Sequence, residues 1–217
     1  MKDLNKFLSI IMLLLSLISC SLLKKVNDPA SLKNTFSKEQ ITLIMQGDSL
    51  KPMQVYQITN SSDSILLRTK SEDVTVDPDN PVLQNLVKRL YSTVRDSMSL
   101  GVGIAAPQAG ILKKIIWVQR FDKENSPFEL YLNPEIIQYS KKKQKCHEGC
   151  LSIPNRTDTL NSRSYAILIE YDKMDNTHHV EMIEDFTAII FQHEIDHLHG
   201  ILYLDHLEKE LKDVTHN

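Results

Sequence analysis

The chain has 217 residues, of which 41% are apolar and 24% are charged, and its formal net charge is -3 at pH 7. This composition is ordinary for a globular protein and allows one core-forming domain with shorter accessory segments. The slightly acidic balance and the shortness of the basic runs give no electrostatic footprint for a nucleic acid, so we expect no nucleic-acid partner.

Residues 1–19 have the pattern of a signal peptide. Two lysines precede an apolar run over 7–18, which is shorter than the about 20 residues that a membrane-spanning helix needs. The run ends in Leu17-Ile18-Ser19-Cys20, which resembles the processing site of bacterial lipoproteins and implies lipidation of Cys20. We therefore expect an exported protein that a lipid anchors to the membrane.

The segment 20–50 is polar and lacks a sustained hydrophobic period, so we expect a tether rather than part of the fold, in which 39–45 could form a short helix. Residues 51–217 have the composition of the folded, functional domain. The alternatives to a cleaved leader are an uncleaved membrane anchor and an internal start at Met45 or Met53, and the internal start would keep the protein in the cytoplasm.

Within the expected domain, hydrophobic spacing predicts two main helices and several strands. Apolar residues recur on one face of 82–94, which is typical of an amphipathic helix on a core. The helix predicted over 186–200 is apolar on nearly all sides before its histidines, so it should lie buried in the middle of the domain. Strands are expected at 53–58 (an edge strand), 115–118, from 131 to 136, and as a hairpin of 165–171 with 179–183.

The motif His193-Glu194-Ile195-Asp196-His197 lies in the second helix. Helical positions four apart lie on one face, so His193 and His197 can reach a single metal ion. Glu194 points toward the place of a water molecule at that ion. This is the arrangement of metal-assisted hydrolysis, in which two imidazoles bind the metal and a carboxylate carries the proton.

Cys150 is the candidate third ligand. A thiolate and two imidazoles leave the fourth tetrahedral position open, which is the pattern of a catalytic metal site. Two other interpretations of this cysteine remain open: a disulfide with Cys146 in an oxidising compartment, or a small buried side chain without chemistry.

The segment Gly101–Gly110 is rich in glycine and alanine, so its backbone can come close to a ligand. Gln108 is the only side chain there with both a donor and an acceptor. The segment has neither phosphate-loop motif, and a tight turn without function is the alternative interpretation.

Segments 101–108, 148–152 and 192–197 together resemble the three motifs of peptide deformylases, which are G-x-G-x-A-A-P-Q, E-G-C-L-S and Q-H-E-x-D-H in that order. The likeness covers roughly 51–210. It implies an α+β fold in which antiparallel β-sheets surround a central helix that carries the H-E-x-x-H motif. It also implies a hydrolase that removes the N-formyl group from the methionine of formyl-Met peptides or nascent chains and releases formate.

The resemblance assigns the metal and the proton carrier. Cys150, His193 and His197 would hold one divalent metal ion per chain, Fe(II) in many members of the family, with Zn, Ni or Co able to take its place. Glu194 would take the proton of the attacking water and pass it to the departing amine.

The resemblance also assigns the substrate contacts. The Gln108 amide and the Leu151 backbone N–H would stabilise charge on the formyl oxygen, and Gly103 would pair with the extended peptide. The remaining assigned residues are Val102, Gly149, Phe186, Ile189 and Ile190 around the substrate, and Glu148 and Asp196 as supports of the loop and of a metal ligand.

Several points remain open. A disulfide between Cys146 and Cys150 would destroy the site. Either Arg156 or Arg163 could be the structural arginine of the family. The leader is unusual, because nascent formyl-Met chains emerge in the cytoplasm.

We expect the protein to be a monomer.

Two rival functions are weighed against this one. A zincin-type metallopeptidase extends the motif to H-E-x-x-H-x-x-G-x-x-H; Gly200 fits this pattern, but Tyr203 stands where the last histidine is needed. A deformylase-like lipoprotein without catalytic activity is the second rival, although every ligand position and the base are present.

Overall fold

The computed structural model describes residues 36–96 and 101–215, so the expected leader and Cys20 lie outside the described residues. The helices are α2 (Lys38–Met45), α3 (Ser61–Leu67), α4 (Pro81–Val94), α5 (Asp185–Leu198) and α6 (Tyr203–Thr215), with the short 3-10 helix η1 (Ala106–Ala109). The strands are β1 (Gly103–Ala105), β2 (Ile115–Gln119), β3 (Phe128–Tyr139), β4 (Lys143–Cys150), β5 (Ile153–Ser164), β6 (Ala166–Asp172) and β7 (His178–Glu184).

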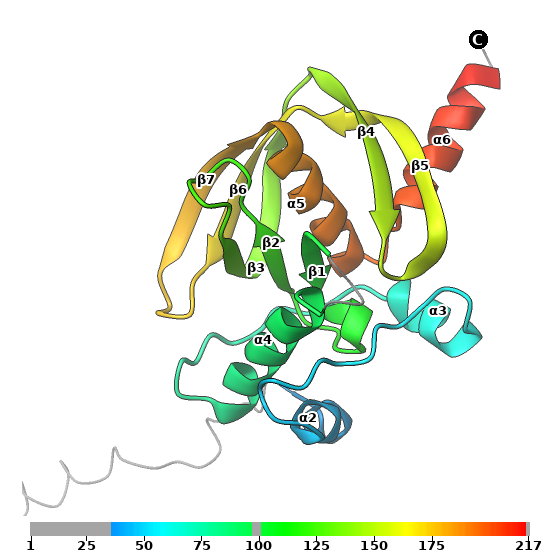
Figure 1. Ribbon diagram of the computed structural model, residues 1–217. Coiled ribbons are helices and arrows are strands. Elements are labelled where there is room, and N and C mark those ends of the chain that lie inside the picture. The colour runs from blue at the N-terminus through cyan, green and yellow to red at the C-terminus, as the bar shows by residue number, and fades with distance from the viewer. Residues whose placement is uncertain (1–35, 97–100, 216–217) are drawn as a thin grey trace, which may run out of the picture. The chain divides into compact units, whose positions relative to one another are not determined.

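The strands form two antiparallel sheets. One has the order β1-β2-β3-β6-β7, and the other is the hairpin of β4 and β5. Helix α5 lies between the two sheets and contacts both (Figure 1). The predicted α+β fold, with antiparallel sheets around a central helix, is confirmed.

Helix α5 is central because most of its surface is apolar. Phe191 packs edge-on against Tyr131 of β3 with 4.7 Å between ring centroids, and Tyr131 packs in the same way on Tyr171 of β6. Burial of this side of the helix holds it against the five-stranded sheet. The buried cluster comprises Ala105, Ile116, Val118, Tyr131, Ile167, Ile169, Tyr171, Ile183, Ala188, Ile190, Phe191, Ile195 and Leu198.

Helix α4 confirms the amphipathic helix predicted over 82–94. The side chain of Asn80 caps its first turn by accepting hydrogen bonds from the backbone N–H groups of Val82 and Leu83, and Pro81 occupies a position that needs no donor. Its apolar face joins a second cluster under β1 and β2. Trp117 of β2 is bound to this helix by a 2.9 Å hydrogen bond from its indole N–H to the Val87 carbonyl.

The tether predicted for 20–50 is wrong for its last part. Phe36 and Ile44 are 2% and 0% exposed, and α2 packs on α4. Ser37 starts α2 with a capping box, in which its hydroxyl accepts from Gln40 N–H while the Gln40 side chain accepts from Ser37 N–H. The fold therefore includes the described residues 36–50 as well as those from 51 on.

The edge strand predicted for 53–58 is also wrong. Four backbone N–H groups there bond to four separate partners: Met53 to the Thr93 hydroxyl, Tyr56 to the Gln108 carbonyl, Gln57 to the Asp63 carboxylate and Ile58 to the Ser152 carbonyl. An extended chain whose donors reach different elements forms no ladder with a single neighbour. The alternating pattern therefore reflects a segment that crosses the domain instead of joining a sheet.

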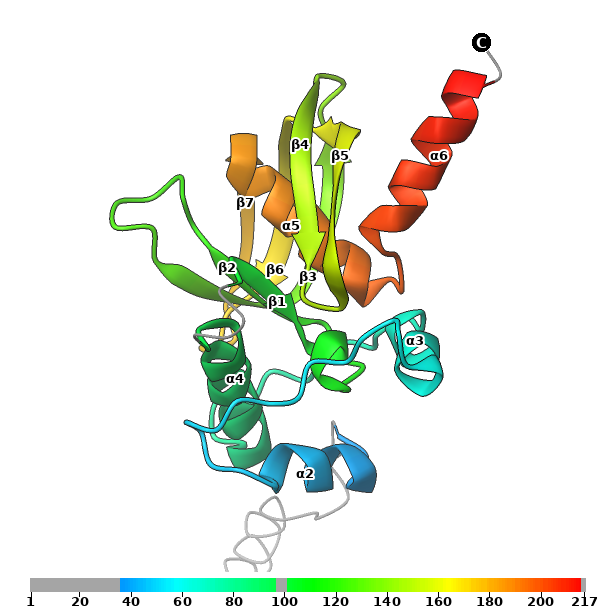
Figure 2. The ribbon, with the colours of Figure 1, turned by 45° about the vertical axis from the view of Figure 1, so that its right-hand side comes forward.

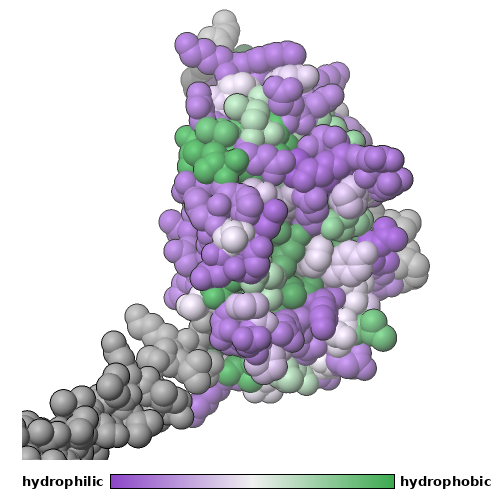
Figure 3. Space-filling model, turned by 90° about the vertical axis from the view of Figure 1, so that its left-hand side faces the viewer, coloured by the Kyte–Doolittle hydropathy of each residue, from purple (hydrophilic) through white to green (hydrophobic). Residues whose placement is uncertain are grey.

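The remaining predicted strands are confirmed as parts of β2, β3, β6 and β7, and the second predicted helix is α5. In Figure 2, α2 and α4 lie together at the lower end of the domain, α3 lies below the start of α6, and α6 projects upward. Hydrophilic side chains cover most of the face shown in Figure 3, and apolar ones gather there in a few small groups. Among the described residues no helix is both long and apolar enough to cross a membrane.

Candidate active site

A cavity of about 610 Å³ lies where β1, the end of β4 and one face of α5 meet. This volume is in the range of sites that hold small ligands or short peptide segments. Its walls bring together residues that are far apart in the sequence, including the glycine-rich segment around Gly103, the end of β4 at Cys150 and the helix at His193.

The three predicted metal ligands converge at this cavity. Candidate ligand atoms of Cys150, His193 and His197 all lie within 4.8 Å of one another. The two imidazoles are one helical turn apart, with ring centroids separated by 5.1 Å, and Cys150 Sγ is 3.2 Å from His197 Nε2. The helix repeat accounts for the pair of histidines, and the β4–β5 hairpin delivers the cysteine.

The chemistry of these residues fits a divalent transition metal. Burial disfavours the ionised Cys150 thiol, but the neighbouring His197 and His193 outweigh it and hold the pKa of Cys150 well below its usual value. A thiolate is the form that binds metal. His193 Nδ1 is 2.9 Å from Glu148 Oε2, so its proton is on that nitrogen and Nε2 is left as a ligand.

Glu194 is buried beside the ligands, and its Oε2 has no hydrogen-bond partner within the described structure. Burial raises the pKa of Glu194 to about 7. A carboxyl group with a pKa near neutrality can both accept and return a proton at physiological pH. The Glu194 side chain lines the cavity and is thus suited to hold a reacting water molecule.

Gly103 leaves the space that the Glu194 carboxylate occupies. A Cβ atom at this position would lie 2.5 Å from Glu194 Oε1, and β1 could move away only by breaking its pairing with Val118 of β2. We expect Gly103→Ala to displace the carboxylate and to lower kcat at least tenfold, a size typical of misplaced catalytic groups.

Metal analysis checks this explanation of the Gly103→Ala variant. The atoms nearest to the new methyl group all belong to Glu194 and not to the three metal ligands. The variant should therefore bind as much metal as the wild type. Loss of metal together with activity, or full activity, would contradict the steric argument.

Gln108 is 1% exposed, and its amide is fixed on both sides. Its Oε1 accepts a 2.9 Å hydrogen bond from Ala105 N–H, while its Nε2 lies 3.3 Å from Ser152 Oγ and 3.6 Å from Cys150 Sγ. The donor end therefore faces the ligands. Leu151 lines the cavity next to them. The expected role of Gln108 and Leu151 N–H toward the formyl oxygen stays a prediction.

The residues expected around the substrate all line the same cavity: Val102, Gly149, Phe186, Ile189 and Ile190. Ile189 and Ile190 form its buried part, whereas Phe186 is 42% exposed and packs its ring 5.4 Å from that of Phe121. The buried part of the cavity is therefore apolar, and an aromatic side chain lies at its exposed rim. Their contacts with a methionine side chain remain a prediction.

Arg163 is the buried structural arginine. Its Nε and NH2 donate to the two carboxylate oxygens of Glu148 at 2.7 and 2.9 Å, and its NH1 donates to Asp196 at 2.6 Å. Hydrogen bonds from His193 and Arg163 overcome the burial of Glu148 and lower its pKa to about 2. Arg156 is exposed, and its side chain pairs with Asp158, two residues away.

The two cysteines of the hairpin are free thiols. They are four residues apart on β4, so their Cα atoms are about 13 Å apart in a regular strand, whereas a disulfide needs less than about 7 Å. A bulge between Gly149 and Cys150 shortens this only in part. The disulfide interpretation is therefore wrong for this fold, and burial raises the pKa of Cys146 to about 11.

Sequence reasoning assigned no role to three residues near the site. Gln192 accepts from Ser164 N–H and donates to the Ser164 carbonyl, which joins α5 to β5, although its place in the Q-H-E-x-D-H motif already singled it out. Ser152 contacts the Gln108 amide. His206 contacts Asp196 from α6, and no motif pointed to it.

Comparison with known proteins agrees with this site. A family model described as polypeptide deformylase matches residues 55–213. A peptide deformylase of Desulforudis audaxviator is 39% identical over 153 residues, covering 70% of this chain and 94% of the relative. One of Leptospira biflexa is 37% identical over 151 residues, covering 66% and 83%.

Solved structures give the same result. A probable peptide deformylase from Synechococcus phage S-SSM7 superposes with a TM-score of 0.63 at 32% identity, covering 71% of this chain and 99% of that one. A class I type b peptide deformylase from Acinetobacter baumannii, bound to Met-Ala-Ser, has a TM-score of 0.62 at 26% identity and covers 71% and 98%.

Proposed function

The chain belongs to the polypeptide deformylase family, and we propose that its cavity removes the N-formyl group from formyl-Met peptides. The observation that carries this proposal is the meeting of Cys150, His193 and His197 beside the carboxylate of Glu194, whose Oε2 has no hydrogen-bond partner among the described residues. The zincin alternative is not favoured. Tyr203, at its third ligand position, is buried and directs its hydroxyl to Asp158.

The residues of the cavity divide the work of hydrolysis. A divalent ion held by the two histidines and the cysteine would act as a Lewis acid toward water and the formyl oxygen. Glu194 accepts the proton of the attacking water and returns it to the departing amine. Gln108 Nε2 and the Leu151 N–H donate hydrogen bonds to the formyl oxygen as its negative charge develops.

The sheet offers a place for the peptide. Within the described residues, strand β1 is at the edge of the five-stranded sheet and pairs with β2 alone. An extended peptide can pair with the free side of such a strand at Gly103, with alternate side chains directed into the cavity. The methionine side chain then enters the apolar part formed by Ile189 and Ile190. The relative with bound Met-Ala-Ser supports this class of ligand.

The metal is proposed to be Fe(II), with Zn, Ni or Co able to replace it. One thiolate and two imidazoles suit each of these borderline ions, and the order of affinities alone does not select among them. The choice in the cell therefore depends on metal supply.

The proposed reaction is tested by mass spectrometry of the products. The anaerobically prepared, metal-loaded full chain is incubated with a formyl-Met peptide and with the same peptide bearing an acetyl group. We expect loss of the formyl group alone, with the peptide bonds intact and the acetyl peptide unchanged. Internal cleavage would identify a peptidase, and an inert, fully loaded wild type would identify a protein that has lost catalysis.

We also propose, from the sequence of residues 1–20, that the mature protein is a membrane-anchored lipoprotein modified at Cys20. In bacterial cells fed a labelled fatty acid, the wild type should carry label and fractionate with membranes. Cys20→Ser should lose the label, whereas Cys146→Ser should keep it. An unlabelled wild type, or a first residue at Met45 or Met53, would show that the protein stays in the cytoplasm.

A further inference from the structure

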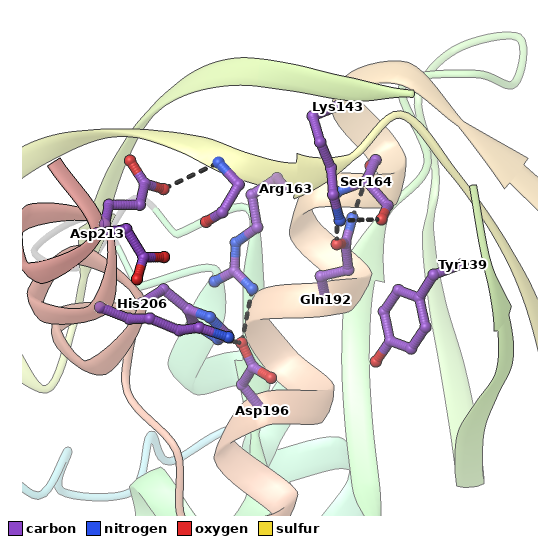
Figure 4. A pocket seen from close by; sticks show the side chains of 11 residues that line it. Tyr139, Lys143, Arg163, Ser164, Gln192, Asp196, His206 and Asp213 are labelled. Carbon is purple, nitrogen blue, oxygen red and sulfur yellow. Dashed lines mark hydrogen bonds and ion pairs between the residues drawn. The ribbon is translucent and has the colours of Figure 1, made fainter. Parts of the chain in front are cut away.

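A second cavity, of about 350 Å³, lies against another face of α5, next to β5 and α6. Arg163, Asp196 and His206 point toward one another in it (Figure 4). His206 comes from α6, Asp196 from α5 and Arg163 from β5, so the cluster ties together three elements. The cluster also contacts the active site, because Arg163 binds the carboxylate of Glu148, which contacts His193.

His206 is the outer member of this cluster. Its Nε2 lies 2.8 Å from Asp196 Oδ2, and Arg163 NH1 donates to the same oxygen at 2.6 Å. A carboxylate only accepts, so the imidazole carries its proton on Nε2 and donates it to Asp196. The Asp196 carboxylate is thus clamped between two donors on different elements.

The cluster continues without a gap to the metal ligands. Arg163 binds both oxygens of Glu148, and Glu148 Oε2 lies 2.9 Å from His193 Nδ1. Four consecutive contacts therefore join His206 to a metal-binding imidazole. The side chains of Arg163 and Glu148, in the middle of this series, are each 4% exposed. The side chain of His206, at its outer end, is 32% exposed.

Charge explains why the outer contact matters. The guanidinium of Arg163 pairs with two carboxylates, those of Glu148 and Asp196. Its one positive charge therefore balances only one of these two negative charges. If Asp196 loses its second donor, it competes more strongly for Arg163 and draws the guanidinium away from Glu148. The Glu148 carboxylate, and with it the ring of His193, then loses its fixed orientation.

We propose that His206 is a positioning residue for the metal site. It holds Asp196 so that Arg163 remains aligned with Glu148 and the Nε2 of His193 stays directed at the ion. This inference rests on the metal site of the proposed function, and it does not depend on the substrate.

The test measures how fast zinc leaves the folded, full-length protein into a chromogenic chelator, well below the melting temperature. His206→Phe keeps a ring of similar volume but removes the donor. It should release zinc about tenfold faster than the wild type, the lower end of the effect of outer partners of metal ligands. His206→Gln keeps an N–H donor and should restore most of the slow release.

His178→Ala is the matched control, because His178 Nδ1 also contacts an aspartate, Asp172, at 3.0 Å, but at the β6–β7 hairpin away from the ligands. Its release rate should equal that of the wild type. Wild-type release from His206→Phe would overturn the inference, even if the metal-free variant melts at a lower temperature. Equally fast release from His206→Gln would overturn it too. Slow zinc release in a protein that leaves formyl peptides intact would refute the proposed activity alone.

Discussion

Glu194→Gln should abolish nearly all formate release while leaving the metal in place. The amide has the size of the carboxylate but cannot take a proton from water, and general base catalysis contributes about 100- to 10,000-fold to such reactions. Glu194 is not among the three residues whose ligand atoms converge. Metal content per chain should therefore equal that of the wild type, so the loss falls on kcat.

Glu184→Gln is the control for this substitution. Glu184 is exposed at the start of α5, and its side chain makes no capping hydrogen bond, so this change should leave kcat and metal content unaltered. The role given to Glu194 would be wrong if Glu194→Gln kept more than about a tenth of the wild-type kcat. Such a loss, of less than about tenfold, is smaller than the weakest usual effect of removing a general base.

Of the substitutions proposed, Arg163→Ala should lower the free energy of unfolding most. It removes the guanidinium that Glu148 and Asp196 share, and breaking a buried ion pair typically costs about 3–5 kcal/mol. For a domain of this size each kcal/mol corresponds to about 2–4 °C, so the melting temperature should fall by about 6–20 °C.

Arg156→Ala provides the comparison, since both arginines were candidates for the structural role. The Arg156 side chain is 51% exposed and makes one local ion pair, which is worth about 0–1 kcal/mol. Scanning calorimetry of the two variants should therefore separate them clearly. Equal melting temperatures for Arg163→Ala and Arg156→Ala would contradict the assignment.

The sequence was most informative where short-range geometry decides position. His193 and His197 are one turn apart on any helix, so their shared target followed from spacing alone. The apolar character of α5 likewise predicted its burial. Cys150 was a candidate ligand because its thiolate would complete the donor set, and the resemblance to a family favoured that role over the alternatives.

Positions that depend on register and packing were not predictable in this way. Arg156 and Arg163 both lie on β5, and only the pairing with β4, interrupted by two irregularities, decides which side chain faces Glu148. His206 reaches Asp196 because α6 packs beside β5, which no local pattern encodes. The short helix α2 lacks a long period, and its inclusion in the fold depends on the surface that α4 offers.

The central claim is that one ion, held by Cys150, His193 and His197, enables this cavity to deformylate a peptide. The most direct measurement titrates the metal-free full chain with Fe(II) under anaerobic conditions and follows formate release from a formyl-Met peptide. We predict no release without metal, and a linear rise that stops at one equivalent per chain, with Cys150→Ala inactive throughout. Release from the metal-free protein, or undiminished release by Cys150→Ala, would contradict the account.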